Sequence, residues 1–293
     1  MKRLIIVAVF FVFTMLSCAV GKSVIKPDSD ISTIKTNSPS DKISRKVLMA
    51  GNWKMNKTVS ESLSVIKTLK KAISDVKDVE ILIFPSYTAL QAINNETKDS
   101  NINIGAQNLF WEAKGAFTGE ISPAMIKDTG CSYVLIGHSE RRQYFGETDE
   151  TVNKKIKAAM AEGLIPIVCI GETLKEMETN VTFQAIEKHM REGLAGLTVE
   201  QASSLVIAYE PVWAIGTGIP VTPDRAQETH AFIRKIYAKM YKEAADKIRI
   251  LYGASVNPEN VSAFMKKPDI DGSLVGKASL EAESFSKLIK YSK

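Results

Sequence analysis

Polar and ionisable residues follow several short apolar runs of this sequence, at the point where each run stops. They include an amide, two ammonium groups, an imidazole and a carboxylate at Asn52, Lys54, Lys277, His138 and Glu210. A carboxylate directly after an apolar run can be partly desolvated, which raises its basicity and suits it to taking a proton. The residue types therefore permit acid–base chemistry, provided that the fold brings them together.

Eight apolar runs of this kind recur, with helical stretches between them. They are apolar throughout instead of alternating with polar residues, which is typical of strands buried on both faces in a parallel sheet. The predicted strands are Val47–Gly51, Glu80–Phe84, Ile102–Ala106, Tyr133–Gly137, Ile165–Ile170, Leu205–Tyr209, Ile248–Tyr252 and Ser273–Gly276. The predicted helices are Val59–Ile73, Asp149–Met160, Phe183–Arg191, Thr222–Lys247 and Asn257–Met265.

Strand and helix alternate eight times over about 247 residues, which predicts an α/β fold of one domain, a (β/α)8 TIM barrel. A doubly wound open sheet is the alternative. In a barrel, active sites lie where the strands end and enter the following loops. The polar residues named above all follow predicted strands, so a barrel would bring them to one rim.

Composition and charge exclude several classes of protein. With 45% hydrophobic residues, 24% charged residues and a mean hydropathy of −0.04, the chain is not disordered, collagen-like, disulfide-stapled or a polytopic membrane protein. Residues 1–46 hold eight Lys or Arg and three acidic residues, which accounts for the whole formal charge of +5. Because the remainder is neutral, we expect no nucleic-acid partner.

Cysteine and histidine give no sign of a disulfide framework or a metal site. Cys131 and Cys169 lie in or beside apolar runs, where a thiol is usually a small buried hydrophobe. The three histidines are far apart, with no HxxxH or Cys/His spacing. We therefore expect neither a metal nor a cofactor.

The first 46 residues differ from the rest of the chain. Leu4 to Leu16 is almost wholly apolar, follows two basic residues, and is shorter than the ~20 residues that span a bilayer. We interpret residues 1–19 as a signal peptide, cleaved near Ala19, and residues 20–46 as a disordered, transit-like leader or linker. Residues 47–293 are then the folded domain, and we expect no stable membrane span in the mature protein.

Four long segments resemble, in their order along the chain, the signature segments of the triosephosphate isomerase family. They are GNWKMN from Gly51, GHSERR from Gly137, AYEPVWAIGTG from Ala208 and LYGASV from Leu251. The resemblance covers everything from about Val47 onward. It implies an isomerase that interconverts dihydroxyacetone phosphate and D-glyceraldehyde 3-phosphate by proton transfer through an enediolate, in glycolysis, gluconeogenesis or plastid triose phosphate metabolism.

The resemblance also implies a role for each polar residue at the rim. Glu210 is the base, although its residue type alone fits a helix cap or an ion pair as well. His138 is a neutral imidazole that polarises the substrate carbonyl, kept neutral by the start of the short helix that follows it. Lys54 supplies positive charge and Asn52 an amide donor near the same oxygen. Glu140 positions Lys54 or forms a purely structural ion pair with it.

The substrate phosphate, on the same resemblance, is held by backbone amides of Gly216, Ser255, Gly276 and Lys277. Two positions differ from the family pattern. Ala254 stands where a second glycine is usual, and Lys277 stands where the family more often has glycine. Both keep a backbone N–H, and the Lys277 side chain either adds charge attraction to the phosphate or is solvated.

Pro211 to Val221 resembles the mobile lid that closes over the substrate and keeps water from the enediolate. Trp213 and Ile215 are its expected apolar anchors. The sequence IPV from Ile219 replaces the more usual lysine, threonine and alanine at the second hinge. Because proline fixes its own φ and restricts the residue before it, we expect altered lid kinetics.

Gln107 to Ile121 resembles the family's protruding loop, which enters a second subunit and supports the catalytic residues; Thr118 belongs to this supporting group. Exposed Phe110, Trp111 and Phe117 would be a liability on a monomer. We therefore expect a homodimer, and a loop packed on its own barrel is the alternative.

Two other functions compete with the isomerase. Another phosphate-binding barrel enzyme would share the phosphate loops but lack the set Asn52, Lys54, His138 and Glu210. A surface-displayed binding protein without catalysis is suggested by the signal-like N-terminus, and retention of all four residues argues against it.

The leader predicts a location. A signal followed by a Ser/Thr/Lys-rich segment resembles the bipartite leaders of proteins sent through the secretory path to a complex, apicoplast-like plastid, where triose phosphates exist. The alternative is an exported bacterial protein, or a lipoprotein modified at Cys18.

Overall fold

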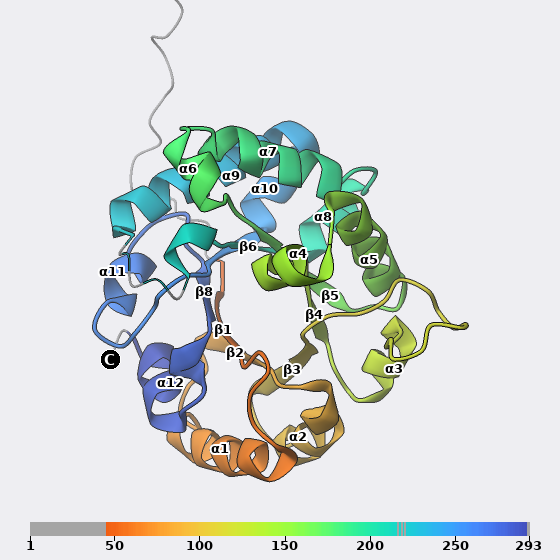
Figure 1. Ribbon diagram of the computed structural model, residues 1–293. Helices are drawn as coiled ribbons and strands as arrows, with labels where there is room; N and C mark the ends of the chain where they lie inside the picture. The colour runs from red at the N-terminus through yellow and green to blue at the C-terminus, as the bar shows by residue number, and fades with distance from the viewer. Residues whose placement is uncertain (1–44, 216, 218, 220, 292–293) are drawn as a thin grey trace, which may run out of the picture. The chain divides into compact units, whose positions relative to one another are not determined.

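The computed structural model describes residues 45–215, 217, 219 and 221–291, and its strands form a closed parallel barrel. They pair in sequence order, and the last pairs with the first (Figure 1). The strands are β1 Val47–Asn52, β2 Val79–Phe84, β3 Ile102–Ala106, β4 Tyr133–Ile136, β5 Ile165–Ile170, β6 Val206–Tyr209, β7 Arg249–Tyr252 and β8 Gly272–Val275. The barrel prediction is confirmed, and each predicted strand end lies within one residue of the observed one. An open sheet is excluded, because β1 pairs with both β2 and β8.

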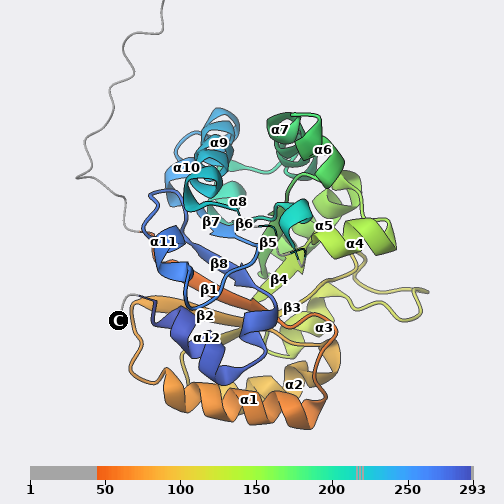
Figure 2. The ribbon, with the colours of Figure 1, turned by 60° about the vertical axis from the view of Figure 1, so that its left-hand side comes forward.

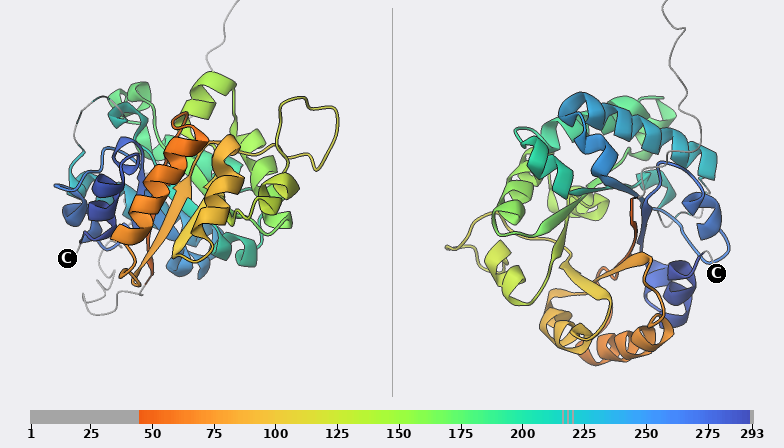
Figure 3. Two further views of the ribbon diagram at one scale, coloured as in Figure 1. Left: turned by 90° about the horizontal axis from the view of Figure 1, so that it is seen from below. Right: turned by 180° about the vertical axis from the view of Figure 1, so that it is seen from behind.

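Helices form a ring around the barrel (Figures 1 and 3). The α-helices are α1 Val59–Ala72, α2 Leu90–Thr97, α3 Pro123–Asp128, α4 Ser139–Phe145, α5 Asp149–Ala161, α6 Leu174–Glu178, α7 Thr182–Gly193, α8 Val199–Ser204, α9 Pro223–Tyr241, α10 Ala244–Lys247, α11 Val261–Met265 and α12 Ala282–Ile289. Three 3₁₀ turns, η1 Tyr87–Ala89, η2 Val212–Ala214 and η3 Lys277–Ser279, follow β2, β6 and β8.

Local capping explains where the longer helices begin. Thr58 and Glu61 form a capping box at the start of α1, and Thr222 caps α9 with Pro223 in its first turn. The single helix predicted over Thr222–Lys247 is wrong, because the chain breaks at Lys242, which has a φ of 51°. Helix α12 was not among the predicted helices; its N-cap residue, Glu281, makes no side-chain capping bond.

The core has two layers. Alternate residues of the strands point into the barrel or out towards the helices, so that Leu48 and Ala50 belong to the inner layer while Met49 belongs to the outer one. Cys169 lies in the inner layer and Cys131 in the outer layer, and both are buried free thiols, as predicted.

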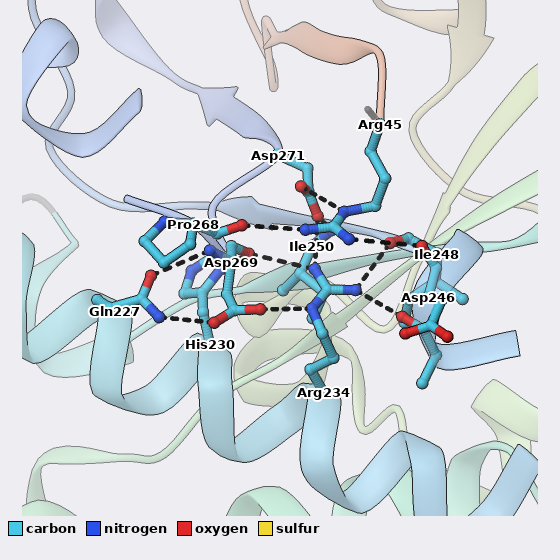
Figure 4. A network of polar contacts seen from close by, with 11 residues as sticks. Arg45, Gln227, His230, Arg234, Asp246, Ile248, Ile250, Pro268, Asp269 and Asp271 are labelled. Atoms are coloured by element: carbon cyan, nitrogen blue, oxygen red, sulfur yellow. Dashed lines mark hydrogen bonds and ion pairs between the residues drawn. The ribbon is translucent and has the colours of Figure 1, made fainter. Parts of the chain in front are cut away.

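At the N-terminal ends of the strands, Arg45 is tied to the barrel. Its Nε donates to Asp271 Oδ1 at 2.7 Å, and Arg234 of α9 donates to the other oxygen of the same carboxylate at 2.7 Å. Figure 4 shows the two arginines converging on Asp271, Arg45 from the segment just before β1 and Arg234 from α9. Arg45 falls inside the segment expected to be disordered up to Lys46, and the structure instead ties its side chain to the barrel.

The remainder of the expected leader, residues 1–44, lies outside the described residues, as does Pro220 of the lid. Across the part that the structure describes, every helix is too short or too polar to cross a membrane.

The loop from Gln107 to Ile121 protrudes from the body of the barrel between β3 and α3 (Figures 2 and 3). Residues 112–120 are all exposed. The expectation that Phe110 and Trp111 are exposed is wrong, since both are half-buried and only Phe117 is exposed. The Phe110 ring packs on Trp111 at 4.2 Å and on Phe117 at 4.6 Å between centroids, which buries part of each ring.

Candidate active site

A cavity of about 550 Å³ opens at the C-terminal ends of the strands. Seven of the sequence-predicted site residues line it: Asn52, Lys54, His138, Glu210, Ser255, Gly276 and Lys277. They come from the C-terminal ends of β1, β4, β6, β7 and β8 and from the loops that follow, which a closed parallel barrel brings to one face. The cavity is therefore at the face where a barrel of this kind carries its chemistry.

Two of the predicted residues that the structure describes, Glu140 and Thr118, are not part of this lining. Glu140 lies outside the lining, and its carboxylate accepts a hydrogen bond from the Lys54 ammonium. Thr118 is exposed on the protruding loop and does not line the cavity. Gly216 lies outside the described residues.

His138 and Glu210 face each other inside the cavity. The Nε2 atom of His138 lies 3.0 Å from Oε1 of Glu210, and both side chains are almost fully buried. The second carboxylate oxygen of Glu210 accepts a hydrogen bond from the Ser139 amide at 3.2 Å. The sequence did not identify this amide contact, because it depends on where the first turn of α4 meets the end of β6.

The hydrogen bonds of His138 define its protonation. Its Nδ1 atom accepts the Glu140 backbone N–H at 3.2 Å, which only an unprotonated nitrogen can do. The proton of a neutral ring is then on Nε2, directed at Glu210. Burial lowers the pKa of His138 and the Glu210 carboxylate raises it, with a net upward displacement while the two groups face each other. The amide at Nδ1 opposes protonation and favours the neutral ring.

Glu210 is an ionised carboxylate in a buried place. Burial raises its pKa, while His138 and the Ser139 amide lower it, and the net direction is downward. The backbone of Gly253 packs closely against one side of the Glu210 side chain, since a Cβ on Gly253 would lie 2.9 Å from Glu210 Cγ. A group that enters between Glu210 and His138 would remove the contact with His138, which lowers the pKa of Glu210. Burial, which raises this pKa, would remain.

Lys54 is held in an uncommon backbone conformation. Its φ is 53°, in the left-handed region, and its N–H donates to Asn52 Oδ1 at 3.0 Å. The Gln107 amide, from the end of β3, donates to the Lys54 carbonyl at 2.8 Å and to the Phe84 carbonyl at 3.0 Å. The Lys54 ammonium lies 2.6 Å from Glu140 Oε1. The sequence analysis named Gln107 only as the start of the protruding loop and gave no sign that its side chain secures Lys54 of the same chain.

The far wall of the cavity is formed by the loops after β7 and β8. Ser255 and Gly276 lie there, and a Cβ on Gly276 would be 4.0 Å from the Lys54 ammonium. This distance brings the backbone after β8 close to a fixed positive charge, an arrangement that suits an anion.

The start of the expected lid is anchored by a buried acid. Trp213 of η2 donates its indole N–H to Glu172 Oε1 at 2.8 Å, and the Tyr209 hydroxyl donates to the same oxygen at 3.2 Å. Burial raises the pKa of Glu172. Trp213 is thus held by a polar contact as well as by packing, and Ile215 lines the cavity.

Within the described ranges, no group of three or more His, Cys, Asp or Glu side chains is arranged to hold a metal ion. The ionisable side chains around the cavity include an imidazole, one buried carboxylate and two ammonium groups. They can move a proton and stabilise an oxyanion with the protein's own groups.

Comparison with known proteins gives consistent matches. The family model for triosephosphate isomerase matches residues 47–292. The triosephosphate isomerase of Endomicrobium trichonymphae is 73% identical over 249 residues, 85% of this chain and 100% of that protein. That of Citrifermentans bemidjiense is 54% identical over 85% of this chain and 99% of its own length. The crystal structure of the Bartonella henselae triosephosphate isomerase superposes with a TM-score of 0.77 at 36% identity, covering 84% of this chain and 98% of that one.

Proposed function

This chain belongs to the triosephosphate isomerase family and interconverts dihydroxyacetone phosphate and D-glyceraldehyde 3-phosphate; from that premise we propose which of its residues carry out each step. The reaction moves a proton between adjacent carbons through an enediolate, on which negative charge develops at oxygen. It requires one base, donors for the oxyanion and a grip on the phosphate.

Glu210 is the base. Its carboxylate takes the proton from the carbon beside the carbonyl and returns it to the neighbouring carbon. The observation that carries this assignment is the 3.0 Å approach of Glu210 Oε1 to His138 Nε2. A substrate that enters between them brings its reacting carbons to the carboxylate and its carbonyl oxygen to the imidazole N–H.

His138 and Lys54 stabilise the charge. A neutral His138 donates Nε2–H to the developing oxyanion, and the Lys54 ammonium adds positive charge nearby. Asn52 contributes an amide group to the same region. Its Oδ1 also accepts the Lys54 N–H, so it holds the turn that presents the ammonium. Glu140 positions the ammonium through the contact at 2.6 Å.

The phosphate is held at the wall formed by Ser255, Gly276 and the amide of Lys277. Gly216 completes this set on the ground of the resemblance alone. Ser255 and Gly276 both line the cavity, and the proximity of Gly276 to Lys54 supports an anion at that end.

The assignment of the base is tested with the purified full chain in a coupled assay, beside Glu210→Gln prepared identically. We expect kcat of the variant to fall by about 10²- to 10⁴-fold, the range that a positioned base contributes. An unchanged kcat in a variant that keeps the circular dichroism of the parent would remove Glu210 from this role.

A homodimer accounts for the apolar groups that the single chain leaves in solvent. Met55 is 96% exposed, Tyr144 and Phe145 of α4 are 69% and 67% exposed, and Phe117 is 43% exposed. Large apolar side chains left exposed in this way are typical of residues that an interface covers. Sedimentation of the purified chain tests this proposal. We expect a dimer that Phe117→Asp weakens, and a monomeric parent with full activity would contradict it.

We propose that the residues before Arg45 act as an export leader. The relatives named above are bacterial, which supports an exported protein, or a lipoprotein modified at Cys18, over the plastid address. Incorporation of labelled palmitate into the expressed full chain, and its loss in Cys18→Ser, is the expected result for a lipoprotein. Recovery of an unlabelled, shortened chain from the medium would indicate plain export.

A further inference from the structure

Of the charged side chains that line the cavity, all but one have a side chain of opposite charge close by. Four of them are present besides His138, and three have an opposite charge close by. The three pairs are Lys54 with Glu140 at 2.6 Å, Glu210 with His138 at 3.0 Å, and Glu281 with Lys57 at 3.7 Å. The fourth is Lys277, whose ammonium has no ion pair or hydrogen bond to any residue that the structure describes.

Lys277 stands where an anion would be attracted. It follows Gly276 directly and begins η3, the turn after β8. The backbone at Gly276 approaches the Lys54 ammonium, since a Cβ there would be 4.0 Å from Nζ. The Lys277 side chain is exposed, lines the same cavity and keeps its conformational freedom.

We propose that the Lys277 ammonium binds the phosphate group of the substrate as a second side-chain cation, in addition to any contact of its backbone amide. This inference rests on the proposed function, because it concerns the phosphate of the same triose. Lys54 already shares its charge with Glu140, whereas Lys277 gains a partner without losing one. A bound phosphate dianion would therefore neutralise the Lys277 ammonium, the one charged group of the described lining that has no partner.

The contribution belongs to binding and not to the proton transfer. The phosphate keeps its charge throughout the reaction, so an interaction with it stabilises the bound substrate and the transition state alike. Removal of the ammonium should raise KM and leave kcat unchanged. Because Lys277 is exposed, we expect an increase of about 2- to 5-fold at low salt, which is typical of an exposed charge pair.

Ionic strength provides a second readout. The Debye length falls from about 30 Å at 0.01 M to about 8 Å at 0.15 M, so the difference between parent and variant should shrink as salt is added. Inorganic phosphate, used as a competitive inhibitor, should lose affinity for the variant by the same factor as the substrate.

The experiment compares the full chain with Lys277→Gln and Lys277→Arg, measuring kcat, KM for glyceraldehyde 3-phosphate and inhibition by inorganic phosphate at low and moderate ionic strength. Lys277→Arg should restore the parent KM, because it keeps the charge. Lys287→Gln is the matched control; this lysine of α12 is paired with Glu283 and does not line the cavity. It should leave all three constants unchanged.

Three results would overturn the inference. A parent KM and parent phosphate inhibition in an active Lys277→Gln would show that the ammonium does not bind phosphate, while the isomerase assignment stands. A fall in kcat at unchanged KM would place Lys277 in positioning instead of binding. A parent chain with no isomerase activity would overturn the proposed function, and this inference with it.

Discussion

The backbone at Gly171 packs directly against the main chain of Glu210, because a Cβ on Gly171 would lie 1.7 Å from the carbonyl oxygen of Glu210. This oxygen belongs to the main chain and cannot rotate away as a flexible side chain would. The position of the Glu210 carboxylate is thus set partly by a residue that carries no functional group.

Gly171→Ala should therefore impair catalysis while every proposed catalytic residue is retained. The added methyl group must displace the end of β6, and a misplacement of about 1 Å can cost about 10²-fold in rate. The measurement is kcat in the coupled assay, together with circular dichroism to show that the barrel is retained. Gly193→Ala is the matched control, because its Cβ would meet Val152 at 3.5 Å, an ordinary contact. Equal activity of the two variants would contradict the prediction.

The strands could be predicted because a parallel barrel buries both of their faces, which leaves continuous apolar runs such as Ile165–Ile170. The break between α9 and α10 could not, since Lys242 adopts a φ of 51° without any glycine or proline to announce it. The tie between Arg45 and Asp271 joins residues 226 positions apart, beyond the reach of a local pattern.

The site divides in the same way. The rim residues could be located from the strand ends, and their proposed roles came from the resemblance of whole segments. The contacts that orient them could not be predicted. The Ser139 amide reaches Glu210 only because β4 and β6 flank β5 in the closed barrel, and Gln107 reaches the Lys54 carbonyl across the rim.

Gln107→Met should weaken both the fold and the site. It removes two hydrogen bonds; the Phe84 carbonyl keeps the Trp53 N–H, while the Lys54 carbonyl loses the Gln107 amide, and we expect a loss of about 1–3 kcal/mol in the free energy of unfolding. It also frees the left-handed turn at Lys54, so kcat/KM should fall several-fold. Urea unfolding and the coupled assay measure the two effects.

Gln227→Met separates these effects. Gln227 donates to Asp269 at 2.6 Å (Figure 4) and neither residue lines the cavity, so loss of this bond should lower stability and spare kcat/KM. If Gln107→Met also spares kcat/KM, then Gln107 does not position Lys54.

Arg45→Ala should lower stability without changing activity. The Arg45 side chain is 9% exposed, and its loss takes one of two arginines from the buried Asp271 carboxylate. We expect a decrease of about 1–3 kcal/mol in the free energy of unfolding. Lys46→Ala, at the exposed neighbouring residue, is the control and should match the parent in urea unfolding. A parent-like midpoint for Arg45→Ala would show that Arg234 alone suffices for Asp271.

His230 should make the protein sensitive to mild acid. It is fully buried, and burial lowers its pKa from 6.5 to about 3. The unfolded chain takes up a proton near pH 6.5 and the folded chain does not, so stability is complete above pH 6.5 and declines as the pH falls towards 3. At pH 5 the loss amounts to about 2 kcal/mol.

His230→Gln removes this titration. The difference in unfolding free energy between pH 7 and pH 5, measured in urea, should be smaller in the variant than in the parent by about 2 kcal/mol, whatever the variant's absolute stability. If this difference is the same in both proteins, His230 does not contribute to the pH dependence of stability between pH 5 and pH 7.

The contact between Arg45 and Asp271 also fixes the end of the barrel at which the first described residue lies. Arg45 lies beside Asp271 and the start of β7, at the ends of the strands remote from the cavity. A pull applied at Arg45 would therefore be resisted by two arginines on Asp271, at the end of the barrel remote from the cavity. An anchored molecule and a released one should turn over triose phosphate at the same rate.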